Sequence, residues 1–395
     1  MRDSRQSPGV PTSAVFLSVF AMHALRLGSF NELEAQLGIA GRWEPWVGPR
    51  KPSADTLGYS LERFDLEGPR TMLAEVGREM KRKKVFRRLY PDSYLVAAVD
   101  GIETVKSRKR HCTACCTREI KVAGETVLEY YHREVVLQMV GVVPALPLDA
   151  EPILSGETET AAALRLLRRV KAAMPRFIDV LTMDAFYLQA PFVREVLDLG
   201  YGVVIVLKQE ERDLYKDAEG LFQITMPEQS ELVHGVGGTT KVWDVRGLTT
   251  WTQLGRPVRV VRELKKRLKR ERIAGKWLER EVEEDWRSVV IVPNAAQQPP
   301  ADNVRRWAHS RWDEETRGFG ELTQHWHLDH SYRRHPTARL ACLLILFLAF
   351  VLTTIFFTRN LKPALRQGKS RLHLARLLYD DLVRGGLESF WARPP

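Results

Sequence analysis

Tyr94-Leu95-Val96-Ala97-Ala98-Val99-Asp100-Gly101 is an apolar run that ends on an acid and a turn-forming glycine. Its apolar and β-branched side chains predict a buried strand that delivers the Asp100 carboxylate. A second such transition occurs at 178–187, where IDVLTM runs into Asp184. Acids at the carboxyl ends of strands converge at one edge of an α/β sheet. We therefore expect Asp100 and Asp184 to lie close together.

The residues around these two strands alternate between strand and helix patterns. Further buried strands are predicted at 135–143 and 203–207, and helices at 160–173 and 190–199. Strands that alternate with helices indicate an α/β fold, with a mixed sheet flanked by helices.

Composition divides the chain of 395 residues into five regions. We expect a helical N-terminal region, an α/β core in two parts, a β-rich insertion between these parts, and a basic helical tail. The insertion is predicted from strand-like pieces at 240–245, 249–253 and 258–261. In chain order the regions are 1–90, 91–208, 209–293, 300–360 and 361–395.

The N-terminal region contains a helix pair with a basic end. Ser53 is expected to cap the first helix, which carries Leu57, Leu61 and Phe64. We interpret the pair as a helix-turn-helix that contacts DNA. The alternative is a helical cap with a solvated basic end. The basic run that ends the second helix is Lys81, Arg82, Lys83 and Lys84.

The charge balance favours a polyanionic partner. Lysine and arginine total 60 against 49 acidic residues, which gives a net charge of +11 and a pI near 9.5, and nucleic acid is the first candidate. The tract RELKKRLKRER at 262–272 is expected to contact the DNA backbone; a solvated helix face is the alternative. The candidate DNA-binding residues of these segments are Lys265, Lys266, Arg267, Lys269 and Arg270, together with Lys208 after the strand at 203–207.

The four cysteines do not suggest a disulfide framework. No secretory signal segment is evident at the start, so a bacterial cytoplasm, with function at the nucleoid, is expected. Cys112 and Cys115 have the spacing of a zinc half-site. The proposed zinc ligands are His111, Cys112, Cys115 and Cys116, with His132 as another choice for the fourth ligand, and reduced cysteines on a strand connection are the alternative.

Two later segments have ordinary and functional interpretations. Histidines 325, 327, 330 and 335 are expected to pack at helix ends and contact phosphate, in preference to binding zinc. The uncharged stretch 340–357 is 18 residues long, the lower bound for a membrane span. Basic residues flank it on both sides, so a buried core helix is favoured over a membrane anchor.

Two converging carboxylates repel each other unless a cation lies between them, and Mg²⁺ or Mn²⁺ prefers such oxygen ligands. Helix caps and turn caps give the same local pattern of an acid after a strand. A third acid supports the metal interpretation. Glu315 lies in RWDEETRGF at 311–319, and Arg311 stands one helical turn before it, where it can pair with Glu315 or with a phosphate.

These motifs resemble the bacterial insertion-sequence transposases of the DDE class, in the branch that cuts and pastes its element. The matching segments are VAAVDG at 96–101, VLTMDAFY at 180–187 and RWDEETRGF at 311–319. The resemblance covers about 94–357. It implies a ribonuclease-H-like core with a first Asp on the opening strand, a second Asp after a later strand, and a Glu on a helix. The β-rich insertion stands between the second Asp and the Glu.

The sequence departs from the family pattern at three positions. The family has a Tyr three residues before the Arg and a Lys seven after the Glu, whereas this chain has Ala308 and Leu322. The phosphate contacts of those side chains are therefore not expected here. Phe319 stands one residue later than usual, and Glu314 is the alternative to Glu315 as the metal ligand.

The resemblance implies an enzyme that cleaves and rejoins DNA with two Mg²⁺ or Mn²⁺ ions held by Asp100, Asp184 and Glu315. Its partners are the terminal inverted repeats of its element and a target DNA, and pairing two ends implies a homodimer on DNA. One alternative is a catalytically inactive DNA-binding protein derived from such an enzyme. Another is a membrane-associated protein anchored by 340–357.

Overall fold

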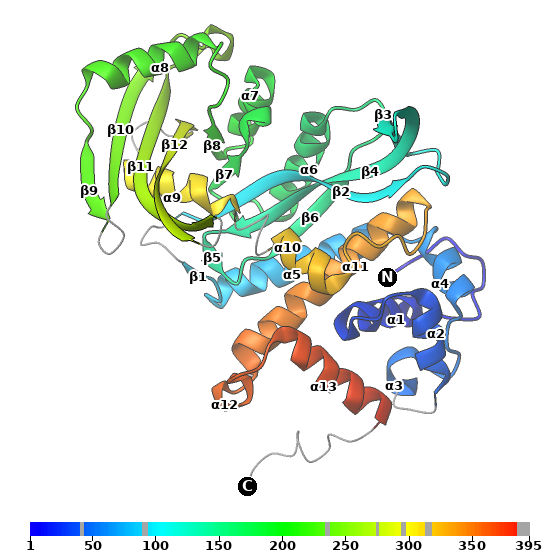
Figure 1. The fold of residues 1–395 in the computed structure, drawn as a ribbon. Helices are drawn as coiled ribbons and strands as arrows, with labels where there is room; N and C mark the ends of the chain where they lie inside the picture. Colours follow the sequence, from blue (N-terminus) through cyan, green and yellow to red (C-terminus); the bar gives the residue numbers. More distant parts are fainter. Residues whose placement is uncertain are drawn as a thin grey trace.

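The backbone is organised around one ten-stranded mixed sheet, with helices on both faces of its central part (Figure 1). The structure is a computed structural model that describes residues 1–39, 43–88, 94–233, 238–273, 276–293, 298–312 and 318–384. The predicted α/β class, with a mixed sheet flanked by helices, is confirmed.

The central strands contain both predicted acidic transitions. β2 lies between antiparallel β4 and parallel β7, and β8 continues the parallel part. β6 also pairs with β4, while β1 and β5 form a separate two-stranded ladder. The strands are β1 (Arg87–Arg88), β2 (Val96–Ser107), β3 (Cys116–Val122), β4 (Glu125–Val140), β5 (Val142–Val143), β6 (Pro147–Pro152), β7 (Val180–Met183) and β8 (Gly202–Val206).

α6, α7 and α9 pack on the two faces of the central strands. α6 (Glu159–Ala173) begins at an N-cap, where Thr158 Oγ1 accepts the Ala161 N–H at 3.3 Å. α6 and α7 (Ala190–Asp198) pack their apolar residues with Ala97 and Val99 on one face. α9 (Ala301–Ser310) packs on the other face, against Val96 and Ala98. Because successive strand residues point to opposite faces, the apolar run of β2 is buried on both sides.

The region predicted as a β-rich insertion extends the same sheet. β12 pairs with β8 in antiparallel register, and β11, β10 and β9 follow outward. The strand predicted at 249–253 is wrong. The chain between β10 and β11 instead forms a 3₁₀ helix, Thr252–Leu254, in which Leu254 is buried. The elements of this region are α8 (Asp213–Ile224), β9 (Gln229–Val233), β10 (Gly238–Leu248), β11 (Val258–Ile273) and β12 (Lys276–Ile291).

A long apolar helix, α11 (Pro336–Ile355), forms the centre of a second core. It contacts β6 on one side and the N-terminal helices on the other (Figure 1). Within the described ranges, Pro336–Asn360 is the one unbroken helix long and apolar enough to cross a membrane, and 72% of its most apolar window is buried inside the fold. That burial supports the interpretation as a core helix. The surrounding helices are α1 (Thr12–Leu25), α2 (Phe30–Gly38), α3 (Glu44–Val47), α4 (Ala54–Leu61), α5 (Glu67–Arg82), α10 (Gly320–Trp326), α12 (Pro363–Arg366) and α13 (Arg371–Arg384), and a π-helical turn, Phe356–Asn360, follows α11.

The predicted helix pair consists of α4 and α5. Ser53 caps α4, because its Oγ accepts the Thr56 N–H at 3.2 Å. Leu57 and Leu61 are fully buried, and both helices contact α11. α5 also packs on α6 and β6, so its apolar side chains reach both cores. The two helices are therefore packed against the rest of the protein, and the basic residues at the end of α5 reach solvent.

Candidate functional site

Asp100 and Asp184 are neighbours because of the parallel register between β2 and β7. The pairing places Val96 beside Val180 and Ala98 beside Thr182, and two further residues along each chain lead to Asp100 and Asp184. The predicted position of Asp100 at a strand end is wrong, since β2 continues to Ser107 along antiparallel β4. β7 ends at Met183 and parallel β8 ends beside it at Val206, so these two strands form the carboxyl edge next to Asp184.

The alternation of the strand sets the face on which Asp100 lies. Val96 and Ala98 pack toward α9, whereas Ala97 and Val99 pack toward α6. Asp100 is an alternate residue of β2 in line with Val96 and Ala98, so its side chain lies on the same face of the sheet, the face that α9 covers. It thus stands where the apolar layer under α9 gives way to charged groups.

Burial controls the ionisation of Asp100, whose side chain is 24% exposed. Loss of hydration raises its pKa to about 6, and the charges of Asp184 and Glu159 act in the same direction. The Gly101 N–H, 2.8 Å from Oδ1, and the charge of Arg311 oppose this rise. The charge of Asp184 therefore disfavours the ionised form of Asp100.

Asp184 also has a local structural role. Its Oδ1 accepts the Phe186 N–H at 2.9 Å and caps the short 3₁₀ helix Ala185–Tyr187. This is the turn-capping alternative raised by the sequence. The cap fixes the direction of the Asp184 side chain. Its other oxygen, Oδ2, can still bind a cation, because an ionised carboxylate accepts several bonds.

Arg311 directs its guanidinium at Asp100. The residue ends α9, its side chain is buried, and Nη1 lies 3.4 Å from Oδ2 of Asp100. α9 is held in place from the insertion, where Glu263 of β11 accepts from Arg305 at 2.8 Å and also pairs with His309. The insertion thus helps to position Arg311 beside the acids.

Glu159 is a third buried acid near the pair, and the sequence did not single it out. It lies in the first turn of α6, accepts from the Tyr187 hydroxyl at 2.8 Å and pairs with Arg133. It fills the space that a side chain at position 101 would need, since a Cβ on Gly101 would lie 2.6 Å from its Oε2. Gly101 therefore permits this acid to approach β2 from the α6 face. No sequence signal links the two positions.

Glu315, together with Asp313 and Glu314, lies outside the described residues. One described residue on each side of this gap lies near the face of Asp100. Arg311 is beside Asp100, and Gly318 packs on Gln138 of β4, so closely that a Cβ at 318 would lie 2.1 Å from the amide oxygen. Gln138 pairs with Ala98, two residues before Asp100 on the same face.

The basic tract in the insertion is strand β11, so the interpretation as a helix face is wrong. β12, its antiparallel partner, carries acids opposite the tract, and cross-strand pairs form. Lys266 Nζ lies 3.0 Å from Glu283, and Arg267 pairs with Glu284. Much of the predicted DNA-binding charge is therefore compensated within the hairpin. Arg270 lies 2.7 Å from Glu279, Lys265 is half-buried, and the side chain of Lys269 lies outside the described ones.

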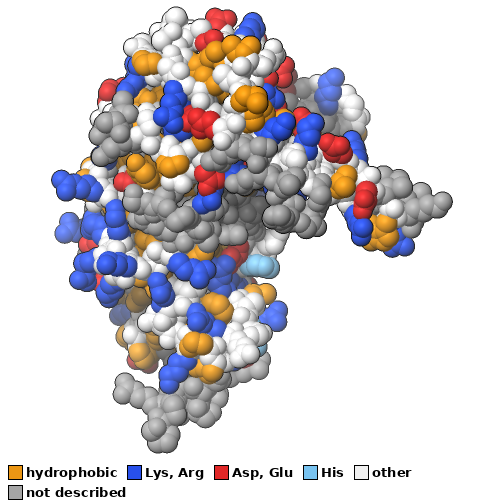
Figure 2. Space-filling view, turned by 90° about the vertical axis from the view of Figure 1, so that its left-hand side faces the viewer, with side chains coloured by type: hydrophobic (Ala, Val, Ile, Leu, Met, Phe, Trp, Pro, Cys, Tyr) orange, Lys and Arg blue, Asp and Glu red, His pale blue; other side chains and the backbone are white. Residues whose placement is uncertain are grey.

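The other predicted DNA contacts differ in availability. Lys81 is directed at the carbonyl of Phe177, 3.2 Å away, while Arg82 and Lys83 both pair with Glu79. Lys84 is exposed. Lys208 is exposed two residues beyond β8, next to Gln209, whose amide donates to the Ala185 carbonyl at 3.1 Å. Lys208 is therefore near the Asp184 turn. Figure 2 shows that Lys and Arg side chains gather at mid-height along the left-hand edge of that view.

Cys112, Cys115 and His132 form a group that could hold a metal ion, and within the described ranges it is the one group of this kind. The predicted ligand set is corrected in two places. Cys116 is directed at the Ile153 carbonyl, 3.8 Å away, and His111 stacks on Tyr130. His132, the other choice for the fourth ligand, belongs to the group.

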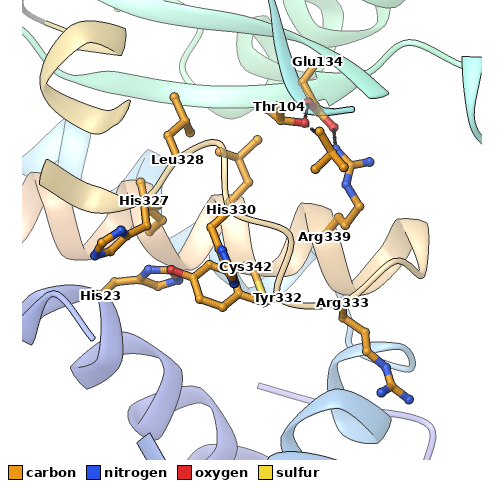
Figure 3. Close-up of a pocket in the computed structure, with 13 residues that line it drawn as sticks. His23, Thr104, Glu134, His327, Leu328, His330, Tyr332, Arg333, Arg339 and Cys342 are labelled. Atoms are coloured by element: carbon orange, nitrogen blue, oxygen red, sulfur yellow. Dashed lines mark hydrogen bonds and ion pairs between the residues drawn. The ribbon is translucent and has the colours of Figure 1, made fainter. Parts of the chain in front are cut away.

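The later histidines lie at helix ends. His325 is in the last turn of α10, His327 ends that helix, and His335 begins α11. His327 and His330 line a cavity of about 30 Å³ together with His23 (Figure 3). Burial lowers the pKa of His23 to about 3, so this imidazole is neutral.

Ala308 and Leu322, which stand where the resembled family has Tyr and Lys, are core residues. Ala308 is buried among the residues that pack under α9, and Leu322 is fully buried in the core around α11. Because both positions are buried among apolar residues, neither can present a side chain to a phosphate. No protein-family model and no curated protein sequence matches the chain.

Proposed function

We propose that this protein is a DDE-type transposase with a ribonuclease-H-like core, which cleaves DNA at the ends of an insertion sequence and joins them to a target. The observation that carries the proposal is the placement of Asp100 on β2 and of Asp184 directly after the adjacent parallel strand β7, with Arg311 beside Asp100. Two neighbouring carboxylates, of which Asp100 has a raised pKa, together with a guanidinium suit a divalent cation and a phosphate.

The chain path supports the ribonuclease-H-like assignment. β2 is the first strand of the large sheet, β7 is a later strand parallel to it, and Asp184 follows β7 directly. β9–β12 then come between Asp184 and the helical segment that holds Arg311. This is the order that the resemblance implies.

Glu315 is proposed as the third metal ligand. It is four residues from Arg311 and three from Gly318, and both lie near the face that carries Asp100. A fully extended chain spans at most about 3.6 Å per residue. Connectivity therefore keeps Glu315 within about 14 Å of the position of Arg311.

Each residue of the site has a defined task in this proposal. Asp100, Asp184 and Glu315 would hold two Mg²⁺ or Mn²⁺ ions, and this bound metal would supply the activation of water and of a DNA 3′-hydroxyl for attack on phosphorus. Arg311 binds a non-bridging oxygen of the scissile phosphate and offsets the charge that develops there. Lys208 contacts the DNA backbone beside the Asp184 turn. Glu159 orients the Asp100 strand through its contact with Gly101.

The test is Mg²⁺-dependent cleavage of a plasmid that carries the DNA flanking the coding sequence. Asp100→Asn and Asp184→Asn should reduce cleavage by at least about a thousandfold and leave binding to the same DNA unchanged. Asp198→Asn, which neutralises an exposed acid on α7, is the matched control and should cleave normally. Binding without cleavage by the unaltered protein supports the inactive DNA-binding alternative, and cleavage by Asp100→Asn refutes the assignment.

A further inference from the structure

Two cysteines and one histidine meet at the connection between β2 and β3. The Sγ atoms of Cys112 and Cys115 are 3.6 Å apart, and each lies 3.2 Å from Nε2 of His132. Cys112 and Cys115 face each other across a tight turn, in which the Cys115 N–H donates to the Cys112 carbonyl at 3.3 Å. His132 comes from β4, so the group joins a loop to the central sheet.

The size of this triangle matches one metal ion with soft ligands. In a tetrahedral Zn²⁺ site, Zn–S distances of about 2.3 Å and Zn–N distances of about 2.0–2.1 Å put the ligand atoms roughly 3.5–3.8 Å apart. The observed separations of 3.2–3.6 Å are close to these values. Thiolate and imidazole ligands favour Zn²⁺ over Mg²⁺, which prefers oxygen. A different metal from that of the acidic site is therefore indicated.

The surroundings offer positive charge and room for one small further ligand. A cavity of about 10 Å³ adjoins the cysteines and is lined by Arg110, Arg334 and Arg339. Guanidinium groups stabilise thiolates, and a cavity of this size accommodates about one water molecule. In the described part of the chain, no fourth Cys, His, Asp or Glu joins the group.

We propose that Cys112, Cys115 and His132 bind a structural Zn²⁺ ion, with a water molecule as the fourth ligand. This site does not depend on the proposed function. It fastens the loop before β3 to β4, at a place where that loop already meets the segment before α11, since Arg334 donates to the Arg110 carbonyl at 3.1 Å.

Arg339 shows how the site adjoins the second core. From α11 its guanidinium reaches Thr104 of β2 at 2.5 Å and Glu134 of β4 at 2.6 Å (Figure 3). Glu134 is two residues from His132, so both side chains lie on the same face of β4. Zinc at His132 therefore stabilises the region where β2, β4 and α11 meet.

The experiment measures metal content in the full-length protein purified under reducing conditions without chelator. We expect about one zinc per chain by elemental analysis. Cys112→Ser, Cys115→Ser and His132→Asn should each lower the zinc content severalfold. Cys116→Ser and His111→Gln are matched controls that alter adjacent residues of the same types and should retain it. Removal of zinc by a chelator should lower the melting temperature, and added Zn²⁺ should restore it.

A second measurement keeps the proposal testable if a variant fails to fold. Co²⁺ bound to the unaltered protein should give thiolate charge-transfer bands and the intense visible bands of a four-coordinate ion. Zinc below about a tenth of an equivalent after reconstitution overturns the proposal. So does equal loss of zinc in Cys116→Ser, a Co²⁺ spectrum without thiolate bands, or a Cys112–Cys115 disulfide in place of the metal.

Discussion

The guanidinium of Arg311 lies 3.4 Å from the carboxylate of Asp100, although the two residues are 211 positions apart. The contact brings the end of α9 to the middle of β2 and opposes the effect of burial on Asp100.

Replacing Arg311 should change both the rate and the pH dependence of cleavage. The charge of Arg311 lowers the pKa of Asp100, so Arg311→Ala raises that pKa further and moves the acidic limb of the pH–rate profile to higher pH. Arg311→Lys keeps the charge and should restore the limb, while cleavage stays at least about tenfold slow, since Lys does not reproduce the planar fork. Profiles of all three proteins at subsaturating Mg²⁺ test this. An unchanged limb in Arg311→Ala contradicts it.

Asp100→Asn should stabilise the metal-free protein in a pH-dependent way. The folded-state pKa of about 6 exceeds the value near 3.9 of an unfolded chain, so the folded state holds the proton more tightly. Stability is therefore lost as the pH rises from about 4 through 6, by at most about 3 kcal/mol. Melting in EDTA should show Asp100→Asn above the unaltered protein at pH 8, with little difference near pH 4. Asp198→Asn should show no such gain, and equal gains at both pH values would refute the explanation.

Gly101 and Glu159 should be energetically coupled. Gly101→Ala places a Cβ 2.6 Å from the Glu159 carboxylate and should cost about 1–3 kcal/mol through overpacking. Glu159→Ala makes room but leaves Arg133 and Tyr187 without their partner. The double variant should therefore lose less stability than the sum, by about 1 kcal/mol or more. Urea unfolding of the unaltered protein, the two single variants and the double variant measures the coupling. If the two losses of unfolding free energy simply add, the contact contributes nothing to stability.

The acids of β12 should limit DNA binding by the basic tract. Lys266 and Arg267 pair with Glu283 and Glu284, so Glu283→Gln/Glu284→Gln releases two positive charges for phosphate contact. DNA affinity should rise, and the slope of log K against log salt should steepen by up to about 1.8. The control, Glu75→Gln/Glu125→Gln, removes two exposed acids elsewhere. Equal effects of both double variants would mean that net charge alone is responsible.

Local sequence patterns predicted most of the central elements. The apolar runs before Asp100 and Asp184 form two strands that pair in parallel, and Ser53 caps its helix as expected. These predictions succeeded because burial and capping depend on residues close together in the chain. The basic tract was misjudged for the opposite reason: its strand form depends on pairing with an acidic strand that follows it, and charge alone does not show that pairing.

By itself, the sequence determined the α/β class, the strands that carry Asp100 and Asp184, and the Cys-x-x-Cys half-site. Only the tertiary structure decided that Arg311 reaches Asp100, that Glu159 lies behind Gly101, and that His132 in place of His111 joins Cys112 and Cys115. The physical reason is that periodicity fixes which face of an element is buried, whereas side-chain contacts between distant segments depend on register and packing angle. The spacing of residues along the chain determines neither the register nor the packing angle.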